Sequence, residues 1–472
     1  KDYWKRTDIE IEGDERLQQC LRFNSFHILQ SVGRDGLRSI SAKGLTGEGY
    51  EGHYFWDAEM YVIPSLLYSN PAVCRKLLEY RYHCLPEARE CARDMGHVRG
   101  ALFPWRTIRG TECSTFFPAG TAQYHINGDI ALAVKNYVQS SGDTGFLEEF
   151  GAEILFETAR FWADLGHFSK GKGNRFCIDC VTGPDEYTAI VNNNFYTNRM
   201  ARENLWYACR VYEQLKRENP KLLSKLCLKI GLEDDEPSSW RKAGDSMYFP
   251  YDEEKGVFLQ DDAFANKADW DFDGTPPEKY PLLLHFHPLV IYRHRVLKQA
   301  DTVLADFMLD QYVDTEQIRR DYDYYEPLTT HDSSLSTCIY SIVANRIGYF
   351  DKAYEYFLRS AFTDLEDHKG NTRDGVHIAN MAGTTMCIIN GFGGVRQREG
   401  RLLLNPVLPK NWRSYTFRLL YQNRLVQVQV NRGEVTFTLV EGESLSFTCY
   451  NREVSLARNI PETISMPSSG HV

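Results

Sequence analysis

Apolar residues recur at three- and four-residue intervals along the chain up to about residue 398, which is the pattern of helices that bury one face. The stretch 15–30 is a clear example, with Leu17, Leu21, Ile28 and Leu29 on one side. The same spacing predicts helices at 57–68, 73–91, 121–139, 144–165, 197–215, 220–230, 300–309, 334–347, 352–362 and 379–390.

Long polar segments rich in glycine and aromatic residues interrupt these helices. They lie at 44–55, 96–119, 170–194 and 321–333. Loops longer than about 12 residues inside a compact domain are usually functional. Many helices alternating with such loops suit a helical barrel or toroid whose loops converge at one end.

In the last seventy residues, apolar side chains recur at every second position, which is the spacing of a β-strand. The stretches 425–430, 434–440 and 444–448 alternate apolar and polar side chains, and Asn431-Arg432-Gly433 separates the first two. Two prolines in 404–412 discourage a helix from running into this part. We therefore predict an α domain over 1–398 and a small antiparallel β domain over 399–472.

Charge and cysteine usage narrow the possible partners. The formal net charge of −10 repels phosphate backbones, so nucleic acid is an unfavourable ligand. No apolar run is long enough for a membrane span, and the N-terminus lacks a secretory signal. The 12 cysteines are scattered except for Cys177 and Cys180, which lack the second ligand pair of a zinc site. We expect free thiols, a cytoplasmic location, no metal and no membrane partner.

Two of the polar segments could serve a sugar. Trp56 offers an aromatic face for stacking and Asp57 an acceptor for hydroxyls, although the pair could equally be a core anchor and a helix cap. Gly183-Pro184 fixes a turn from which Glu186 projects. Partial desolvation of that carboxyl would suit a general acid, whereas the alternative is a solvated turn residue.

Two further segments carry hydrogen-bonding groups. Lys298 and Gln299 could hold sugar hydroxyls or form a solvated helix end. The segments 329–336 and 374–385 combine hydroxyls, His377 and small residues at predicted helix starts. This combination is typical of an anion nest, but also of ordinary helix capping.

These polar segments, together with the segment 103–106, form six sequence blocks. In this order, the six blocks resemble glycoside hydrolase family 65, the inverting α-glucoside phosphorylases. The blocks are 52–57, Phe103-Pro-Trp-Arg106, Gly183-Pro-Asp-Glu-Tyr187 with 193–198, Lys298-Gln-Ala-Asp301, Thr330-His-Asp-Ser-Ser-Leu-Ser336 and Asp374-Gly-Val-His-Ile378. The resemblance implies an (α/α)6 barrel followed by a small β domain. Family members also carry an N-terminal β-sandwich, which we expect this chain to lack.

The resemblance also implies roles. Glu186 matches the general acid, and Trp56, Asp57, Lys298 and Gln299 match the glucose site. Trp105 and Arg106 are predicted substrate contacts within the loop 99–117, which we expect to select the acceptor sugar. Phosphate, the co-substrate, needs only to be bound and aimed. We assign that work to Ser333, Ser334, His377 and the main chain of Gly383 and Thr384.

The expected reaction converts an α-glucobiose and phosphate into β-glucose 1-phosphate and a free sugar, without any other cofactor. The segments 100–106 and 121–127 look more like those of kojibiose or nigerose phosphorylases than of maltose phosphorylases. One alternative is an inverting hydrolase that uses Asp332, Asp374 or Glu326 as base. Another is a non-catalytic carbohydrate-binding relative. By resemblance the protein could form a homodimer.

Overall fold

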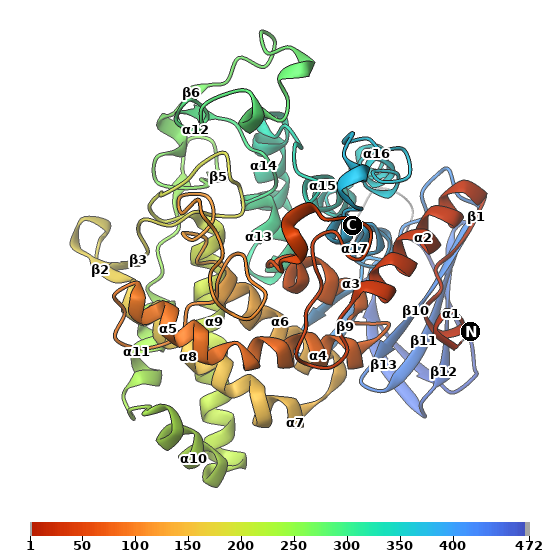
Figure 1. The fold of residues 1–472 in the computed structure, drawn as a ribbon. Coiled ribbons are helices and arrows are strands. Elements are labelled where there is room, and N and C mark those ends of the chain that lie inside the picture. Colours follow the sequence, from red (N-terminus) through yellow and green to blue (C-terminus); the bar gives the residue numbers. More distant parts are fainter. Residues whose placement is uncertain (1, 468–472) are drawn as a thin grey trace. The chain divides into compact units, whose positions relative to one another are not determined.

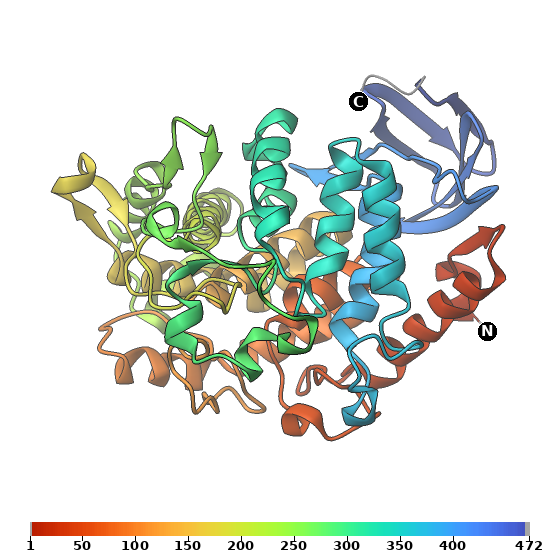
Figure 2. The ribbon, with the colours of Figure 1, turned by 90° about the horizontal axis from the view of Figure 1, so that it is seen from above.

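The computed structural model describes residues 2–467 (Figures 1 and 2). By its internal contacts the chain divides into two compact units. The first unit comprises Lys1–Leu77, Asn136–Asp143 and Thr337–Val472, and the second comprises Leu78–Lys135 and Thr144–Ser336. Helices make up about half of the described residues. The prediction of a mainly helical chain with a β-rich C-terminal part is therefore confirmed.

The first unit contains the predicted N-terminal helix. This helix, α2, begins at Glu15 because the Asp14 carboxylate accepts a hydrogen bond from the Leu17 N–H at 2.9 Å. Helices α16 and α17 run side by side (cyan in Figure 2), and α17 also packs on α2. The helices of this unit are α1 (Asp2–Thr7), α2 (Glu15–Ser31), α3 (Ile63–Leu66), α15 (Ser336–Arg346), α16 (Phe350–Ala361) and α17 (Ile378–Met386).

Two β-sheets complete the first unit, and all their strands except the red β1 are blue in Figure 1. One has the strand order β1-β10-β11-β12-β15 and the other β14-β13-β9-β8. Phe437 and Phe447 join them, with ring centroids 4.9 Å apart. The strands are β1 (Glu10–Glu12), β8 (Arg396–Arg398), β9 (Arg401–Leu404), β10 (Ser414–Tyr421), β11 (Arg424–Asn431), β12 (Glu434–Glu441), β13 (Ser444–Cys449), β14 (Arg452–Ala457) and β15 (Glu462–Ser465).

The three strands predicted from alternation correspond to β11, β12 and β13. Two features differ from the predicted purely antiparallel C-terminal module. Strand β9 pairs with β13 in parallel, and β1, from the N-terminal part of the chain, pairs with β10. A three-residue strand is too short to produce a detectable alternation, so its pairing could not be predicted from the sequence.

The second unit holds the remaining helices and three short strand pairs. The range 73–91, predicted as one helix, forms α4 and α5, because Pro86 at the start of α5 cannot donate a main-chain hydrogen bond. The helices are α4 (Pro71–His83) and α6 (Ile126–Ser141), both shared between the units, and α5 (Leu85–Asp94), α7 (Thr144–Phe146), α8 (Ala152–Leu165), α9 (Phe195–Glu218), α10 (Pro220–Ile230), α11 (Glu236–Asp245), α12 (Pro288–Ile291), α13 (Thr302–Met308) and α14 (Thr315–Tyr325). The strand pairs are β2 (His167–Ser169) with β3 (Arg175–Cys177), β4 (Tyr251–Asp252) with β5 (Val257–Phe258), and β6 (Ala268–Asp269) with β7 (His294–Arg295).

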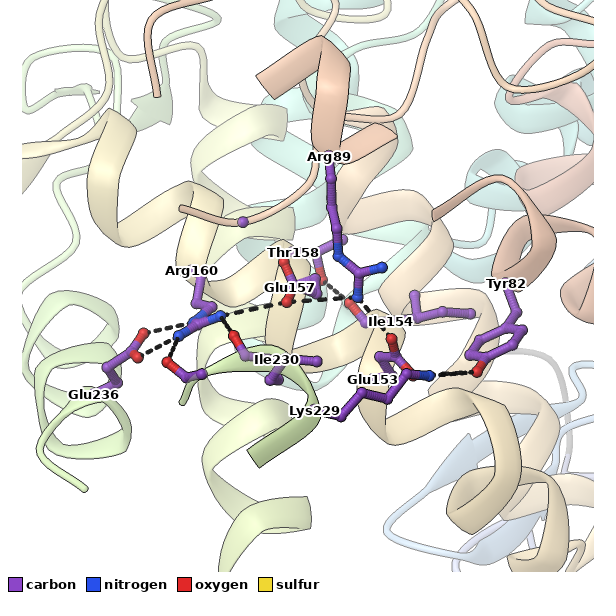
Figure 3. A network of polar contacts seen from close by, with 12 residues as sticks. Tyr82, Arg89, Glu153, Ile154, Glu157, Thr158, Arg160, Lys229, Ile230 and Glu236 are labelled. Atoms are coloured by element: carbon purple, nitrogen blue, oxygen red, sulfur yellow. Dashed lines mark hydrogen bonds and ion pairs between the residues drawn. The ribbon is translucent and has the colours of Figure 1, made fainter. Parts of the chain in front are cut away.

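Charged side chains connect four helices of the second unit (Figure 3). Arg160 on α8 binds both carboxylate oxygens of Glu236 on α11, at 2.8 and 2.7 Å, and the carbonyl of Ile230 at 2.7 Å. Glu153 on α8 pairs with Arg89 on α5 and with Lys229 on α10, each at 2.6 Å. Because the carboxylates are buried, the network specifies how α5, α8, α10 and α11 pack.

Candidate active site

The predicted acid Glu186 lies in a loop of the second unit that is closed at its base. Val181 and Val191 pair across that base through main-chain hydrogen bonds of 2.9 and 2.8 Å. Thr182 Oγ1 fixes the loop further by donating to the Pro118 carbonyl at 2.5 Å. We call residues 181–191 the acid loop. The Glu186 side chain is 20% exposed, so its carboxylate is partly shielded from water but accessible.

Buried polar groups fix the start of this loop. Asn194 caps α9 by accepting the Thr197 N–H at 2.8 Å, and its Nδ2 lies 3.1 Å from both carboxylate oxygens of Asp301. Burial raises the pKa of Asp301 well above its ordinary value. Gly183 passes so close to this pair that a Cβ would lie 2.3 Å from Asp301 Oδ2. Only glycine fits here without displacing the loop or the carboxyl group.

Two predicted sugar-binding residues contact the acid loop directly. Lys298 Nζ lies 2.6 Å from Glu186 Oε2, which places a cation beside the candidate acid. Gln299 Nε2 donates to the Pro184 carbonyl at 2.6 Å. Gln299 is 97% buried, at 3% exposure, so in this structure its amide supports the turn. The structure therefore brings Glu186, Lys298 and Gln299 together, as the sequence predicted.

The predicted phosphate residues of the second unit lie next to this group. Thr330 donates its main-chain N–H to the Leu297 carbonyl at 2.9 Å, so the two segments run side by side. The next contact along them joins the Ser333 N–H to the Lys298 carbonyl at 3.5 Å. Ser333 and Ser334 are both partly exposed. They lie where a small anion could approach Lys298.

Asp332, the first candidate base of a hydrolase, is bound to the residue that follows Glu186. The Tyr187 hydroxyl donates to Asp332 Oδ2, and the Leu282 N–H lies 2.8 Å from that hydroxyl and 3.2 Å from the same carboxylate oxygen. The Tyr187 ring is buried in an apolar cluster with Trp270, Leu282, Ile291 and Val296. Asp332 Oδ2 therefore holds the middle of the acid loop, at Tyr187, against this cluster.

Trp105 and Arg106 belong to a loop of the same unit that a carboxylate organises. Glu112 accepts their main-chain N–H groups at 2.7 and 3.2 Å. A Cβ at Gly120 would lie 3.0 Å from the Trp105 indole, so the segment 118–122 packs closely on that ring. Two carbonyls of this segment accept hydrogen bonds from the acid loop. The predicted acceptor contacts and Glu186 are thus connected through a common segment.

The other predicted sugar residues, Trp56 and Asp57, lie in the first unit. Trp56 is only 3% exposed and packs edge-on against Tyr61, with ring centroids 5.8 Å apart, which favours its interpretation as a core anchor. Asp57 directly precedes a π-helical turn at Ala58–Val62 and does not cap it through its side chain. Asp57 thus occupies the N-cap position, as the alternative interpretation expects, but without a side-chain cap hydrogen bond, and its sugar-binding role stays a prediction.

His377, Gly383 and Thr384 also belong to the first unit. His377 precedes α17, and its Nδ1 lies 2.7 Å from the buried carboxylate of Asp364. Gly383 and Thr384 are the sixth and seventh residues of α17. Main-chain N–H groups at such positions already donate within the helix, so this placement does not favour the predicted binding of phosphate by their main chain.

Sequence reasoning missed the buried supports of the acid loop. Asp301 and Asn194 stand in the quoted blocks, but nothing in their local sequence indicates that they contact each other across 107 residues. Within residues 2–467, no group of three or more His, Cys, Asp or Glu side chains could hold a metal ion, and no helix is long and apolar enough to cross a membrane. The cysteines are free thiols.

Comparison with known proteins gives consistent matches over nearly the whole chain. A model described as the glycosyl hydrolase family 65 central catalytic domain matches residues 22–386, and one for the C-terminal domain of that family matches residues 395–456. A solved structure described as "Putative kojibiose phosphorylase from human microbiome" superposes with a TM-score of 0.93 at 31% identity. That match covers 100% of this chain and 68% of the other.

Two curated relatives differ in their similarity to this chain. The alpha,alpha-trehalose phosphorylase of Geobacillus stearothermophilus is 52% identical, over 98% of this chain and 60% of the relative. The kojibiose phosphorylase of Halothermothrix orenii is 36% identical, over 93% of this chain and 58% of the relative. The chain thus spans about 60% of the length of these curated relatives.

Proposed function

The chain belongs to glycosyl hydrolase family 65, and we propose that it catalyses the phosphorolysis of an α-linked glucose disaccharide with inversion at the anomeric carbon. We propose likewise that residues 1–398 form an (α/α)6 barrel and residues 399–472 a β domain. The observation that carries the proposal is the placement of Glu186, partly shielded, on a loop fixed by buried groups and beside Lys298.

In the proposed reaction, Glu186 donates its proton to the glycosidic oxygen as the bond from that oxygen to the anomeric carbon breaks. A phosphate oxygen attacks the same carbon from the opposite face. The products are β-glucose 1-phosphate and the released sugar. Lys298, beside the acid, is proposed to hold a hydroxyl of the glucose, with Gln299 and Asp57 as further predicted contacts. Ser333 and Ser334 in the second unit, and His377 in the first, stay the predicted phosphate ligands.

Phosphorolysis is favoured over hydrolysis by the surroundings of Asp332. A hydrolase of this type needs a second carboxylate that activates water. The Oδ2 atom of Asp332 instead accepts hydrogen bonds from Tyr187 and Leu282. A phosphorylase needs no such base, because phosphate already carries the negative charge of the nucleophile. The names of the relatives support the same choice.

The proposed substrate is α,α-trehalose, since identity is 52% to a trehalose phosphorylase and 36% to a kojibiose phosphorylase. This differs from the kojibiose or nigerose preference expected from two short segments. A panel of α-1,1, α-1,2, α-1,3 and α-1,4 glucobioses, each with phosphate, tests it. The α-1,1 compound should give the highest kcat/KM. Faster turnover of any other linkage would contradict the assignment.

The role of Glu186 is tested by Glu186→Gln, which preserves shape but cannot donate the proton. We expect kcat to fall by about 1,000-fold, within the range for loss of a general acid. Glu326→Gln is the matched control, because Glu326 is a candidate base only in the hydrolytic alternative. It should leave phosphorolysis unchanged. A Glu186→Gln enzyme with near wild-type kcat would remove this residue as the acid.

A further inference from the structure

Asp185, the residue directly before Glu186, is completely buried and bonds to its own loop and to two other segments of the second unit. Its Oδ1 accepts the main-chain N–H of Lys298 at 2.7 Å and of Tyr187 at 3.2 Å. Its Oδ2 accepts Gln260 Nε2 at 2.9 Å. A carboxylate in the protein interior is costly unless such hydrogen bonds compensate for lost hydration. The arrangement therefore implies that these contacts have a purpose beyond packing.

Lys298 is consequently attached to the acid loop at two points. Its main-chain N–H binds Asp185, and its ammonium lies 2.6 Å from the Glu186 carboxylate. Ordering a free lysine side chain costs conformational entropy. A fixed main chain leaves only the side-chain torsions to be set before the ammonium reaches Glu186. Asp185 therefore helps to fix the main-chain position from which the Lys298 side chain extends.

We propose that Asp185 is a positioning residue that acts through Lys298: by accepting the Lys298 main-chain N–H, it sets the place of the Lys298 ammonium beside Glu186. The inference rests on the function proposed above, in which Glu186 is the acid and Lys298 a sugar contact. Because Asp185 is completely buried, we expect it to touch neither the sugar nor the phosphate. Its effect on catalysis passes through the main chain of its neighbour.

The charge of Asp185 is consistent with this role. Burial raises its pKa to about 6, while the hydrogen bonds from Gln260, Lys298 and Tyr187, together with the charge of Lys267, oppose the rise. At neutral pH the carboxyl is therefore mostly ionised. Both oxygens are then available as acceptors, as the observed contacts require.

A double-mutant cycle tests the inference on the whole chain, with phosphate-dependent cleavage of α,α-trehalose as the assay. Asp185→Ala should lower kcat/KM by about 100-fold, the scale of a misplaced active-site group. In a Lys298→Ala background the same substitution should cost less than about threefold, since the connection it serves is already lost. Equal losses in the two backgrounds, for folded proteins, would overturn the inference.

The conservative variant separates positioning from folding. Asp185→Asn keeps an oxygen for the Lys298 and Tyr187 N–H groups, and the Gln260 amide can turn to present Oε1, which has no hydrogen-bond partner among the described residues. Its kcat/KM should stay within about fivefold of wild type. If Asp185→Ala does not fold, the kcat/KM of the Asp185→Asn variant alone tests the proposal. A folded Asp185→Asn enzyme as impaired as Lys298→Ala would contradict the account.

Asp321→Ala serves as the matched control. Asp321 is also a completely buried carboxyl, but it accepts the Phe258 N–H at 2.9 Å and Gln317 Nε2 at 3.0 Å. Its effect on kcat/KM should be the same with and without Lys298. Wild-type protein that cleaves none of the glucobioses with phosphate would instead overturn the proposed function, which is a different result from additivity in an active enzyme.

Discussion

Gly183 is the residue at which the acid loop comes nearest to its buried supports. A methyl group there would lie 2.3 Å from Asp301 Oδ2 and 2.4 Å from Asn194 Nδ2. We expect Gly183→Ala to destabilise the protein by about 1–3 kcal/mol and to displace the loop, lowering kcat at least about tenfold. Gly171→Ala is the control, because its nearest neighbour would lie 3.9 Å away. Denaturation and steady-state kinetics compare the two, and equal effects would refute the steric argument.

Asp321 gives a residue-scale prediction about pH. Burial raises its pKa to about 7, opposed by hydrogen bonds from Gln317 and Phe258. An aspartate in the unfolded chain titrates near 3.9, so between about pH 4 and 7 the folded state binds more protons and stability falls as pH rises. Asp321→Asn removes this dependence. Between about pH 5 and 8 the variant should gain about 2 kcal/mol relative to wild type in urea unfolding. Parallel pH curves would contradict the assignment.

The resemblance to the family implied that Glu186, Lys298 and Gln299 belong to one site, whereas residue type and spacing alone left each of them open, and the structure places the three side by side. Residue type and spacing could not predict Asp185 as a support. Its partners Gln260 and Lys298 lie 75 and 113 residues away, and local sequence carries no information on such contacts. Trp56 shows a second limit: the sequence left open whether this aromatic residue stacks on a sugar or anchors the core, and only the structure shows that it is buried.

At the scale of elements, the ion-pair network fixes α8 against α10 and α11 (Figure 3). Glu236→Ala removes the two-oxygen partner of the 94% buried Arg160, at 6% exposure, and leaves it the weaker, 3.4 Å contact with the Glu157 carboxylate, so we expect a loss of about 3 kcal/mol. Glu233→Ala is the matched control, because Glu233 pairs with Arg99 at the surface. That exposed pair should contribute less than about 1 kcal/mol. Chemical denaturation measures the free energy of unfolding of both variants. Similar losses would contradict the claim that burial makes the Arg160–Glu236 pair the stronger one.

Element positions followed from periodicity where a helix buries a continuous stripe, as α2 and α10 do. The segment 321–333 was predicted as a loop, yet α14 extends to Tyr325. Its first turn is capped by Asp314, which accepts the Gln317 N–H at 2.7 Å. The helix buries a stripe made of Ile318 and two tyrosines, Tyr322 and Tyr325, so the purely aliphatic pattern used to predict helices did not reveal it. A tertiary hydrogen bond from the Phe258 N–H to Asp321, at 2.9 Å, also holds it in place.

At the scale of the whole molecule, the sequence led to a helical chain with a C-terminal β part and to its family, and both are confirmed. The net charge of −10 sets a condition on the proposed chemistry. Long-range attraction cannot collect phosphate, so nearby donors must do so. In the second unit, the predicted phosphate residue Ser333 lies beside the cation Lys298, which we propose as one such donor.

The central claim is inverting phosphorolysis, and proton NMR of the anomeric region tests it most directly. The protein is mixed with α,α-trehalose in the presence and absence of inorganic phosphate. The account predicts that β-glucose 1-phosphate and glucose appear in equal amounts at early times, and that neither forms without phosphate. Glucose released at the same rate without phosphate, or the α anomer of glucose 1-phosphate as the first product, would contradict it.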